Sequence, residues 1–247
     1  MPENRSSIIS GKLFGIFAVA ELLILIALKL TENLGNPLIA DELLMFSAIL
    51  LNALFMLFLV TRVKRAGKDL MLLGIPLAVF TTLLADCFLV LLHGLSDSEI
   101  IHFISPLQAN MIGFFVFGIV QVVYACHLGL TRRRILIRVG FYLAFIVAIA
   151  YAGLLTLDHF IACLSMSQLI LNLVFVWIEH AKKRTRASLL LAVGISLFFG
   201  CDTFIMMRIL LPQDGFLYTA ICFMVWVFYI PSQVVLTSCY YVDRTSA

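Results

Sequence analysis

The chain has 247 residues, of which 63% are hydrophobic and 13% charged, and its formal net charge is +3. Soluble domains average roughly 45–50% apolar and about 25% charged residues, so this composition excludes a soluble globular protein. Apolar runs of about 20 residues recur along the whole chain, and each is long enough to cross a hydrocarbon layer of about 30 Å as a helix. The sequence therefore predicts an all-α, multi-pass integral membrane protein with a single transmembrane domain over residues 1–247.

Eight spans are predicted, and both ends of each are set by polar residues. The break between the fifth and sixth spans is the short segment LDHF (157–160). The first span is expected to remain in the mature protein, because no small-residue cleavage pattern follows it. The predicted spans are 12–31, 42–61, 70–92, 106–130, 135–157, 160–180, 188–211 and 216–241.

Basic and acidic loops alternate along the chain. Because Lys and Arg concentrate in short cytoplasmic loops, this alternation predicts that both termini are cytoplasmic, in a plasma or inner membrane. The net positive charge suits contact with anionic lipid headgroups and gives no reason to expect nucleic acid as a partner. The basic segments are 61–68, 131–138 and 182–186, and the segments with acids but no bases are 31–42, 93–99 and 211–215.

The two halves of the chain carry similar short motifs in the same order. The offsets between matched motifs are 120, 116 and 112 residues, and changes in loop length could absorb these differences. The matches suggest two parallel four-helix repeats, 1–131 and 132–247, about an axis along the membrane normal, although the first and fifth spans do not match. The matched motifs are LNALF (51–55) with LNLVF (171–175), ADCFLV (85–90) with CDTFIM (201–206), and QVVY (121–124) with QVVL (233–236).

Two aspartates fall inside predicted spans. At 1.5 Å per residue, Asp86 and Asp202 come about 24 and 21 Å above the cytoplasmic edge, at nearly the same depth. Ionisable residues at membrane depth are costly and normally face the interior of a bundle. Two carboxyls in one poorly hydrated pocket lose their protons in separate steps, so one can act as a general acid beside an ionised partner. The other reading is that both are structural acids satisfied by neighbouring Thr, Gln or Asn side chains.

Other polar residues could complete the interior below the aspartates. Amides inside spans are also common interhelical hydrogen-bonding groups, and a buried tyrosine is also a common core residue. The histidines lie near the two membrane surfaces, so no metal site and no cofactor are expected. The candidate substrate-binding residues are Gln121, Tyr124, Gln233, Asn52 and Glu21.

These motifs resemble the YhhN family of membrane lysoplasmalogenases, and the likeness runs through nearly the whole chain. The corresponding segments read ADCFLVLL (85–92), FGIVQVVY (117–124), GCDTF (200–204) and YIPSQVVL (229–236). The chain departs from the family pattern at three positions and lacks the Lys-Pro pair expected at the start of the second helix. Ala85 stands in place of glycine, Cys201 in place of serine, and Gln121 in place of histidine.

The resemblance implies an intramembrane hydrolase, with Asp86 and Asp202 as its catalytic residues. Its substrate would be a lysophospholipid, a lysoplasmalogen, whose vinyl ether bond is cleaved to an aldehyde and a glycerophospho-base. Protonation of a vinyl ether gives an oxocarbenium ion, and a protonated carboxyl with a nearby carboxylate suits that chemistry.

Two other functions are compatible with the same residues. A small proton-coupled transporter or a lipid-binding membrane protein could also use parallel four-helix halves and an acid pair inside the membrane. A structural subunit without its own ligand would explain the hydrophobicity but not two acids at one depth.

Overall fold

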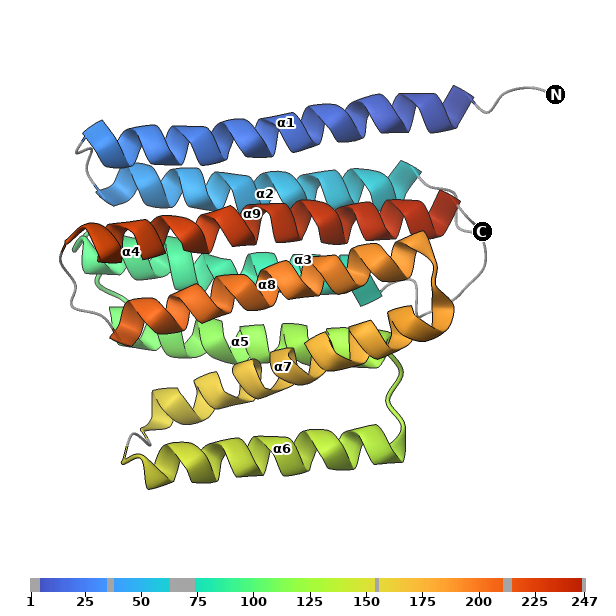
Figure 1. The fold of residues 1–247 in the computed structure, drawn as a ribbon. Helices are drawn as coiled ribbons and strands as arrows, with labels where there is room; N and C mark the ends of the chain where they lie inside the picture. Colours follow the sequence, from blue (N-terminus) through green and yellow to red (C-terminus); the bar gives the residue numbers. More distant parts are fainter. Residues whose placement is uncertain (1–4, 35–37, 63–73, 154–155, 211–214, 246–247) are drawn as a thin grey trace.

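The fold was obtained as a computed structural model, which describes residues 5–34, 38–62, 74–153, 156–210 and 215–245. Every regular element in these ranges is helical (Figure 1). The elements are α1 (Arg5–Leu34), α2 (Leu38–Arg62), α3 (Gly74–Asp86), the π-helical segment η2 (Cys87–Leu92), α4 (His93–Asp97), α5 (Pro106–His127), α6 (Arg132–Tyr151), α7 (Leu157–Lys183), α8 (Arg186–Leu210) and α9 (Phe216–Thr245).

Within the described ranges, eight helical stretches are long and apolar enough to cross a membrane. The third of these, Gly74–Asp97, combines α3, η2 and α4. Large apolar side chains such as Ile16, Leu136 and Val147 are exposed on the outer surface, where a bilayer would cover them. The prediction of an all-α, multi-pass membrane protein with eight spans is confirmed.

The break between the fifth and sixth spans was predicted at the wrong place. α6 ends at Tyr151, and Gly153 has a φ of +71°, a conformation that glycine adopts without steric cost. Thr156 then caps α7, because its side chain accepts a hydrogen bond from the backbone N–H of His159. The residues LDHF, which we expected to form a loop, are therefore the first turn of α7. The turn at Gly153 and the cap at Thr156 set the boundary between α6 and α7, and the polar residues of LDHF do not.

The boundary before α5 follows from local capping. The Ser105 hydroxyl accepts a hydrogen bond from the Gln108 N–H at 3.2 Å, and the Gln108 side chain accepts one from the Ser105 N–H at 3.0 Å. Pro106 occupies the first turn, where its missing N–H costs nothing. At the other end, α5 stops at His127, earlier than predicted, and Gly129 turns the chain with a φ of +83°.

The third span is not the continuous α-helix that we predicted. It changes to a π-helix directly after Asp86 and returns to α-helix at His93. Short π-helical stretches are rare and frequent at functional sites. The η2 segment lies close to α5, since a Cβ added at Gly113 would be 2.4 Å from Cγ of Leu89. Glycine at position 113 therefore allows α5 to approach the segment that follows Asp86.

We expect Gly113→Ala to destabilise the protein by about 1–2 kcal/mol, because overpacking exceeds the gain in helix propensity. Gly140→Ala is the matched control, since no atom lies within 4 Å of a Cβ added at Gly140 on the exposed face of α6. That change should stabilise by up to about 1 kcal/mol. Thermal unfolding of both variants in one detergent measures the difference. Equal effects would show that the contact between Gly113 and Leu89 is unimportant.

The helices form one bundle with α1 at one edge and α6 at the other (Figure 1). α1 packs on α2 and α9, whereas α6 packs on α7. The buried apolar core lies between the inner helices α2, α3, α5, α7, α8 and α9. α1 begins and α9 ends at the same end of the bundle, the end at which α6 begins with three arginines (Figure 1). The positive-inside rule predicts that this basic end is cytoplasmic.

The packing of the helices follows the proposed repeat. α1 on α2, α2 on α3 and α3 on α5 in the first half correspond to α6 on α7, α7 on α8 and α8 on α9 in the second. Between the halves, α5 packs on α7 and α9 packs on α2, which are again corresponding pairs. α1 also packs on α9. The corresponding pair in the other half, α6 and α5, has no comparable contact among the described residues. The repeat stays a prediction, and this packing favours it.

Candidate functional site

Asp86 is buried where α3 meets α9. It lies 12 residues after Gly74, where the described span begins, which is about 18 Å along the helix; the predicted start at residue 70 gave about 24 Å. Its carboxylate accepts a hydrogen bond from the hydroxyl of Tyr229, which is on α9. Tyr229 is itself buried. The hydrogen bond fixes the Asp86 side chain toward α9 and leaves one carboxylate oxygen for other partners.

Asp202 lies on α8, 16 residues into its span, about 24 Å along the helix from the basic end. It is partly buried, and α8 packs against α9, as α3 does. No described residue forms a hydrogen bond with its carboxyl group. Asp86 and Asp202 thus lie on helices that both pack on α9, in unequal surroundings.

An aromatic cluster connects the helices that carry the two aspartates. Phe198 lies one turn before Asp202 on α8, and its ring centroid is 5.8 Å from that of Tyr229 on α9. On its other side it contacts Phe117 of α5 edge to face, with centroids 5.2 Å apart. Phe117 and Tyr229 occupy matching positions in the two halves, at the 112-residue offset of the glutamines. The position that supplies a hydroxyl to Asp86 thus holds a phenylalanine in the other half.

Asn52 and Gln233, both candidate binding residues, contact one another. The Asn52 amide on α2 donates to Gln233 Oε1 on α9 at 3.2 Å. The hydroxyl of Thr237, one turn further along α9, donates to Asn52 Oδ1 at 2.8 Å. All three side chains are buried. These hydrogen bonds connect α2 with α9. Such interhelical bonding is the structural role that the sequence suggested as the alternative to ligand binding.

Gln121 takes part in the matching contact of the other half. Asn172 on α7 donates to Gln121 Oε1 on α5 at 3.0 Å. Asn172 and Gln121 are the residues that the repeat pairs with Asn52 and Gln233. The donor to Asn172 Oδ1 is here a guanidinium nitrogen of Arg138, at 2.8 Å. Corresponding amide pairs therefore join the two halves. The asparagine of one pair accepts from a cation, Arg138, and that of the other accepts from the neutral hydroxyl of Thr237.

Two further candidates, Glu21 and Tyr124, are buried without a partner for a polar atom. Oε1 of Glu21 and the hydroxyl of Tyr124 form no hydrogen bond with described residues. Glu21 lies on α1, which packs against α2 and α9, and Tyr124 lies on α5 next to the aromatic core. The structure does not join either of them to the aspartates by a hydrogen bond.

Two clefts lie near the ends of the bundle. One, of about 320 Å³, is lined by Ser96, residues 101–105 and Gln108 at the end opposite the basic residues. The other, of about 90 Å³, lies at the basic end between α3, α5, α7, α8 and α9, and His127, Glu179 and Lys183 are in its lining. Neither cleft is lined by Asp86 or Asp202.

Sequence reasoning missed Tyr229 and Arg138. Tyr229 could have been found, because it precedes Gln233 by one helical turn and so shares its face. Arg138 was counted with the basic loop that precedes it, yet three apolar residues separate it from Arg134. That position inside an apolar stretch was the available signal for a buried cation.

The chain matches no protein-family model, no characterised protein and no solved structure. Its helices and composition define its class, a multi-pass integral membrane protein with eight spans in the described part of the chain. Its function is therefore argued from the aspartates and their surroundings.

Proposed function

We propose that the protein is an intramembrane hydrolase that cleaves the vinyl ether bond of a lysoplasmalogen or a related lysolipid. The observation that carries the proposal is the unequal surroundings of two acids within membrane-spanning helices: Asp86 accepts a hydrogen bond from Tyr229, whereas no described residue forms a hydrogen bond with the carboxyl group of Asp202. A hydrogen bond to a carboxylate favours its charged form. Asp86, which accepts the Tyr229 hydrogen bond, is the proposed carboxylate, and Asp202 is the proposed acid.

The reaction begins when Asp202 gives its proton to the vinyl carbon that is β to the ether oxygen and carries the hydrocarbon chain. The double bond supplies the electrons of the new C–H bond, and an oxocarbenium ion forms beside the charged Asp86. Water adds to the positive carbon as Asp86 takes the proton of that water. The hemiacetal then breaks into an aldehyde and a glycerophospho-base: protonated Asp86 gives its proton to the leaving glycerol oxygen, and Asp202 takes the proton of the hemiacetal hydroxyl, which restores both groups. Each proton transfer between a positioned carboxyl and the substrate contributes about 10²- to 10⁴-fold.

The test is to give purified protein in detergent a lysoplasmalogen and measure aldehyde release. A lysolipid with a saturated ether and the same headgroup is the matched control, because it has no double bond to protonate. We expect turnover of the vinyl ether alone. Cleavage of an acyl lysolipid instead would indicate an esterase, and a lack of turnover on any vinyl ether lipid would contradict the proposal.

Tyr229→Phe should lower kcat about tenfold or more, because a hydrogen bond to a charged group contributes about 1.5–3 kcal/mol. The change should also shift the pH profile of kcat, since it removes the donor that favours the ionised Asp86. Tyr151→Phe is the control: Tyr151 is 95% exposed on α6 and its removal should leave kcat unchanged. An unaltered pH profile in Tyr229→Phe would separate Tyr229 from the chemistry.

A proton-coupled transporter is the second candidate, favoured by the corresponding amide pairs that join the two halves. Parallel repeats with a site between them are typical of transporters. Proteoliposomes with an imposed pH gradient and labelled lysophosphatidylcholine, which has no vinyl ether, distinguish the two. Movement of intact lipid that depends on the gradient and on Asp86 would favour transport. Aldehyde release without such movement would favour hydrolysis.

A further inference from the structure

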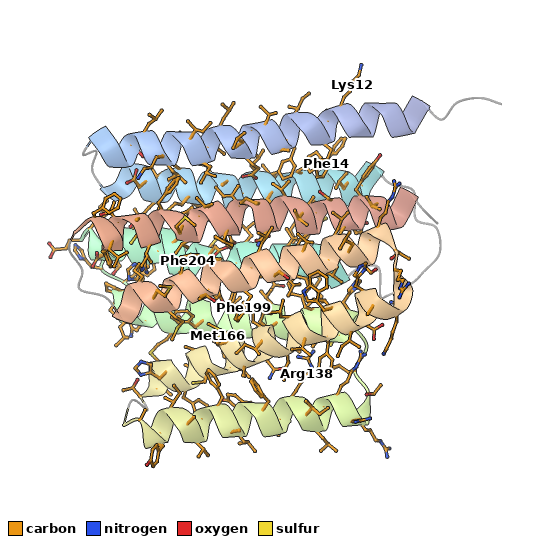
Figure 2. All side chains as sticks on the ribbon, viewed as in Figure 1. Lys12, Phe14, Arg138, Met166, Phe199 and Phe204 are labelled. Atoms are coloured by element: carbon orange, nitrogen blue, oxygen red, sulfur yellow. The ribbon has the colours of Figure 1, made fainter. Side chains whose placement is uncertain are left out.

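Arg138 is a cation inside the bundle, on a helix that otherwise faces outward. It is the one buried residue of α6, with 6% of its surface exposed. Its side chain lies between α6 and α7 (Figure 2), and it donates to Gln168 Oε1 at 3.0 Å and Asn172 Oδ1 at 2.8 Å. Neither partner is charged, and no described carboxylate forms an ion pair with it. A buried charge without a counter-charge is strongly unfavourable.

The unsatisfied atoms of this network are hydrogen-bond donors. Nε of Arg138 and Nε2 of Gln121 are buried and have no partner among described residues. Asn172 links the two side chains, because it accepts from Arg138 and donates to Gln121. An acceptor with negative charge forms the strongest hydrogen bonds with such donors and also balances the charge of the cation. A phosphate group, with several oxygens and a negative charge, meets both requirements.

The amide pair itself does not need a cation. In the first half of the chain, the corresponding Asn52 Oδ1 accepts from the neutral hydroxyl of Thr237. In the second half, the same atom of Asn172 accepts from Arg138. A neutral donor therefore suffices to orient the asparagine. The contact between the asparagine and the glutamine therefore does not explain why the donor in the second half carries a charge.

The surroundings of Arg138 attract anions. Arg134, one turn before it, lies over the same ring of Phe175, with distances of 5.0 and 5.1 Å from the two guanidinium carbons to the ring centroid. Among the described residues near Arg138, the acidic side chain is that of Glu179. Its Oε1 forms an ion pair with a guanidinium nitrogen of Arg134 at 2.5 Å. The other cations at this end of α6 and α7 are Arg132, Arg133, Lys182, Lys183 and Arg184.

Arg138 also lies at a suitable depth for a lipid. It follows Arg132, the first residue of α6, by six positions, about 9 Å along the helix. Basic pockets between transmembrane helices on the cytoplasmic side bind anionic headgroups. We propose that the interface of α6 with α7 binds the phosphate of an anionic phospholipid from the leaflet at the basic end, with Arg138 as the central cation and Gln121 as a second donor.

The experiment uses the full chain in detergent with phosphatidylglycerol as the probe and phosphatidylcholine as the reference. Bound lipid is counted by native mass spectrometry, and the Tm is measured with each lipid. We expect phosphatidylglycerol to be retained and to raise the Tm. Arg138→Gln should weaken its binding about tenfold, which corresponds to about 1.4 kcal/mol. Arg133→Gln removes the same charge from an exposed position of α6 and should keep the binding.

Arg138→Gln could loosen α6, so a second variant keeps the interface. Gln121→Glu retains an acceptor for Asn172 and supplies a carboxylate within the network of Arg138. It should raise the Tm without lipid and remove the response to phosphatidylglycerol. A full response in this variant would overturn the proposal. So would equal losses in Arg138→Gln and Arg133→Gln, which would indicate a diffuse basic surface. Inorganic phosphate that displaces the lipid and gives the same Tm shift would show a free-anion site instead.

Discussion

Asp202→Asn is expected to lower the rate of aldehyde release from a lysoplasmalogen by at least about 100-fold, because it removes the proposed proton donor. An amide has nearly the same size as the carboxyl but cannot deliver a proton to carbon. Asp86→Asn should cost a similar factor, since a neutral side chain stabilises an oxocarbenium ion less well. Rates under single-turnover conditions measure both effects without interference from product release.

Asp97→Asn is the control for loss of an acid from the same span as Asp86. Asp97 is exposed at the end of α4, and its replacement should leave the rate unchanged. The double variant of Asp86 and Asp202 should be little slower than either single variant, because residues that act as a unit are not additive. Undiminished turnover in both single variants would show that the aspartate pair does not carry the reaction.

Asn172→Leu is expected to destabilise the protein by about 3 kcal/mol, and Asn52→Leu by about 1 kcal/mol. Each change breaks an amide pair between the halves of the chain. The loss at Asn172 also removes an acceptor from the buried Arg138, and hydrogen bonds to charged groups are the stronger ones. Neutral hydrogen bonds between transmembrane helices average about 0.6 kcal/mol. The two positions should therefore differ although their sequences and contacts correspond.

Thermal unfolding of the two variants in the same detergent tests this difference. Arg138→Met combined with Asn172→Leu is the informative double variant, because it removes the cation together with its acceptor. That combination should be more stable than Asn172→Leu alone, since an apolar side chain replaces an unpaired buried charge. Equal destabilisation by Asn52→Leu and Asn172→Leu would show that the Arg138 contact contributes nothing.

Much of the fold follows from the sequence because each span satisfies its own backbone hydrogen bonds inside an apolar stretch. The length of each run sets the number of crossings, and the basic loops set the orientation. The boundaries were less predictable. The boundary between α6 and α7 lies at the turn at Gly153 and the cap at Thr156 and not at LDHF, because backbone conformation and capping there had more effect than the polar residues of LDHF. The π-helical segment after Asp86 was also missed, since residues 87–92 carry no proline or glycine that would mark it.

The sequence indicated several of the side chains that the structure shows in contact, but not the contacts themselves. Asp86 and Asp202 could be recognised because carboxyls are rare in apolar spans. The shared LN and QVV motifs indicated asparagines and glutamines that form corresponding hydrogen bonds in the structure. The sequence could not show that these amides bond to one another across the two halves. Nor could it show that Tyr229 contacts one aspartate and that the other has no such partner.

The sequence by itself determined the class of protein, the eight spans and the two acids within them, since hydrophobicity and charge act locally along each helix. The tertiary structure decided what those acids and amides contact. Side chains on different helices meet only when the bundle packs. That packing placed Tyr229 against Asp86, gave Asp202 no hydrogen-bonding partner among the described residues, and buried Arg138 beside two amides. Asp86 and Asp202 occupy matching positions in the two halves, but Tyr229, which donates to Asp86, corresponds to Phe117 in the other half, so the two acids have different environments.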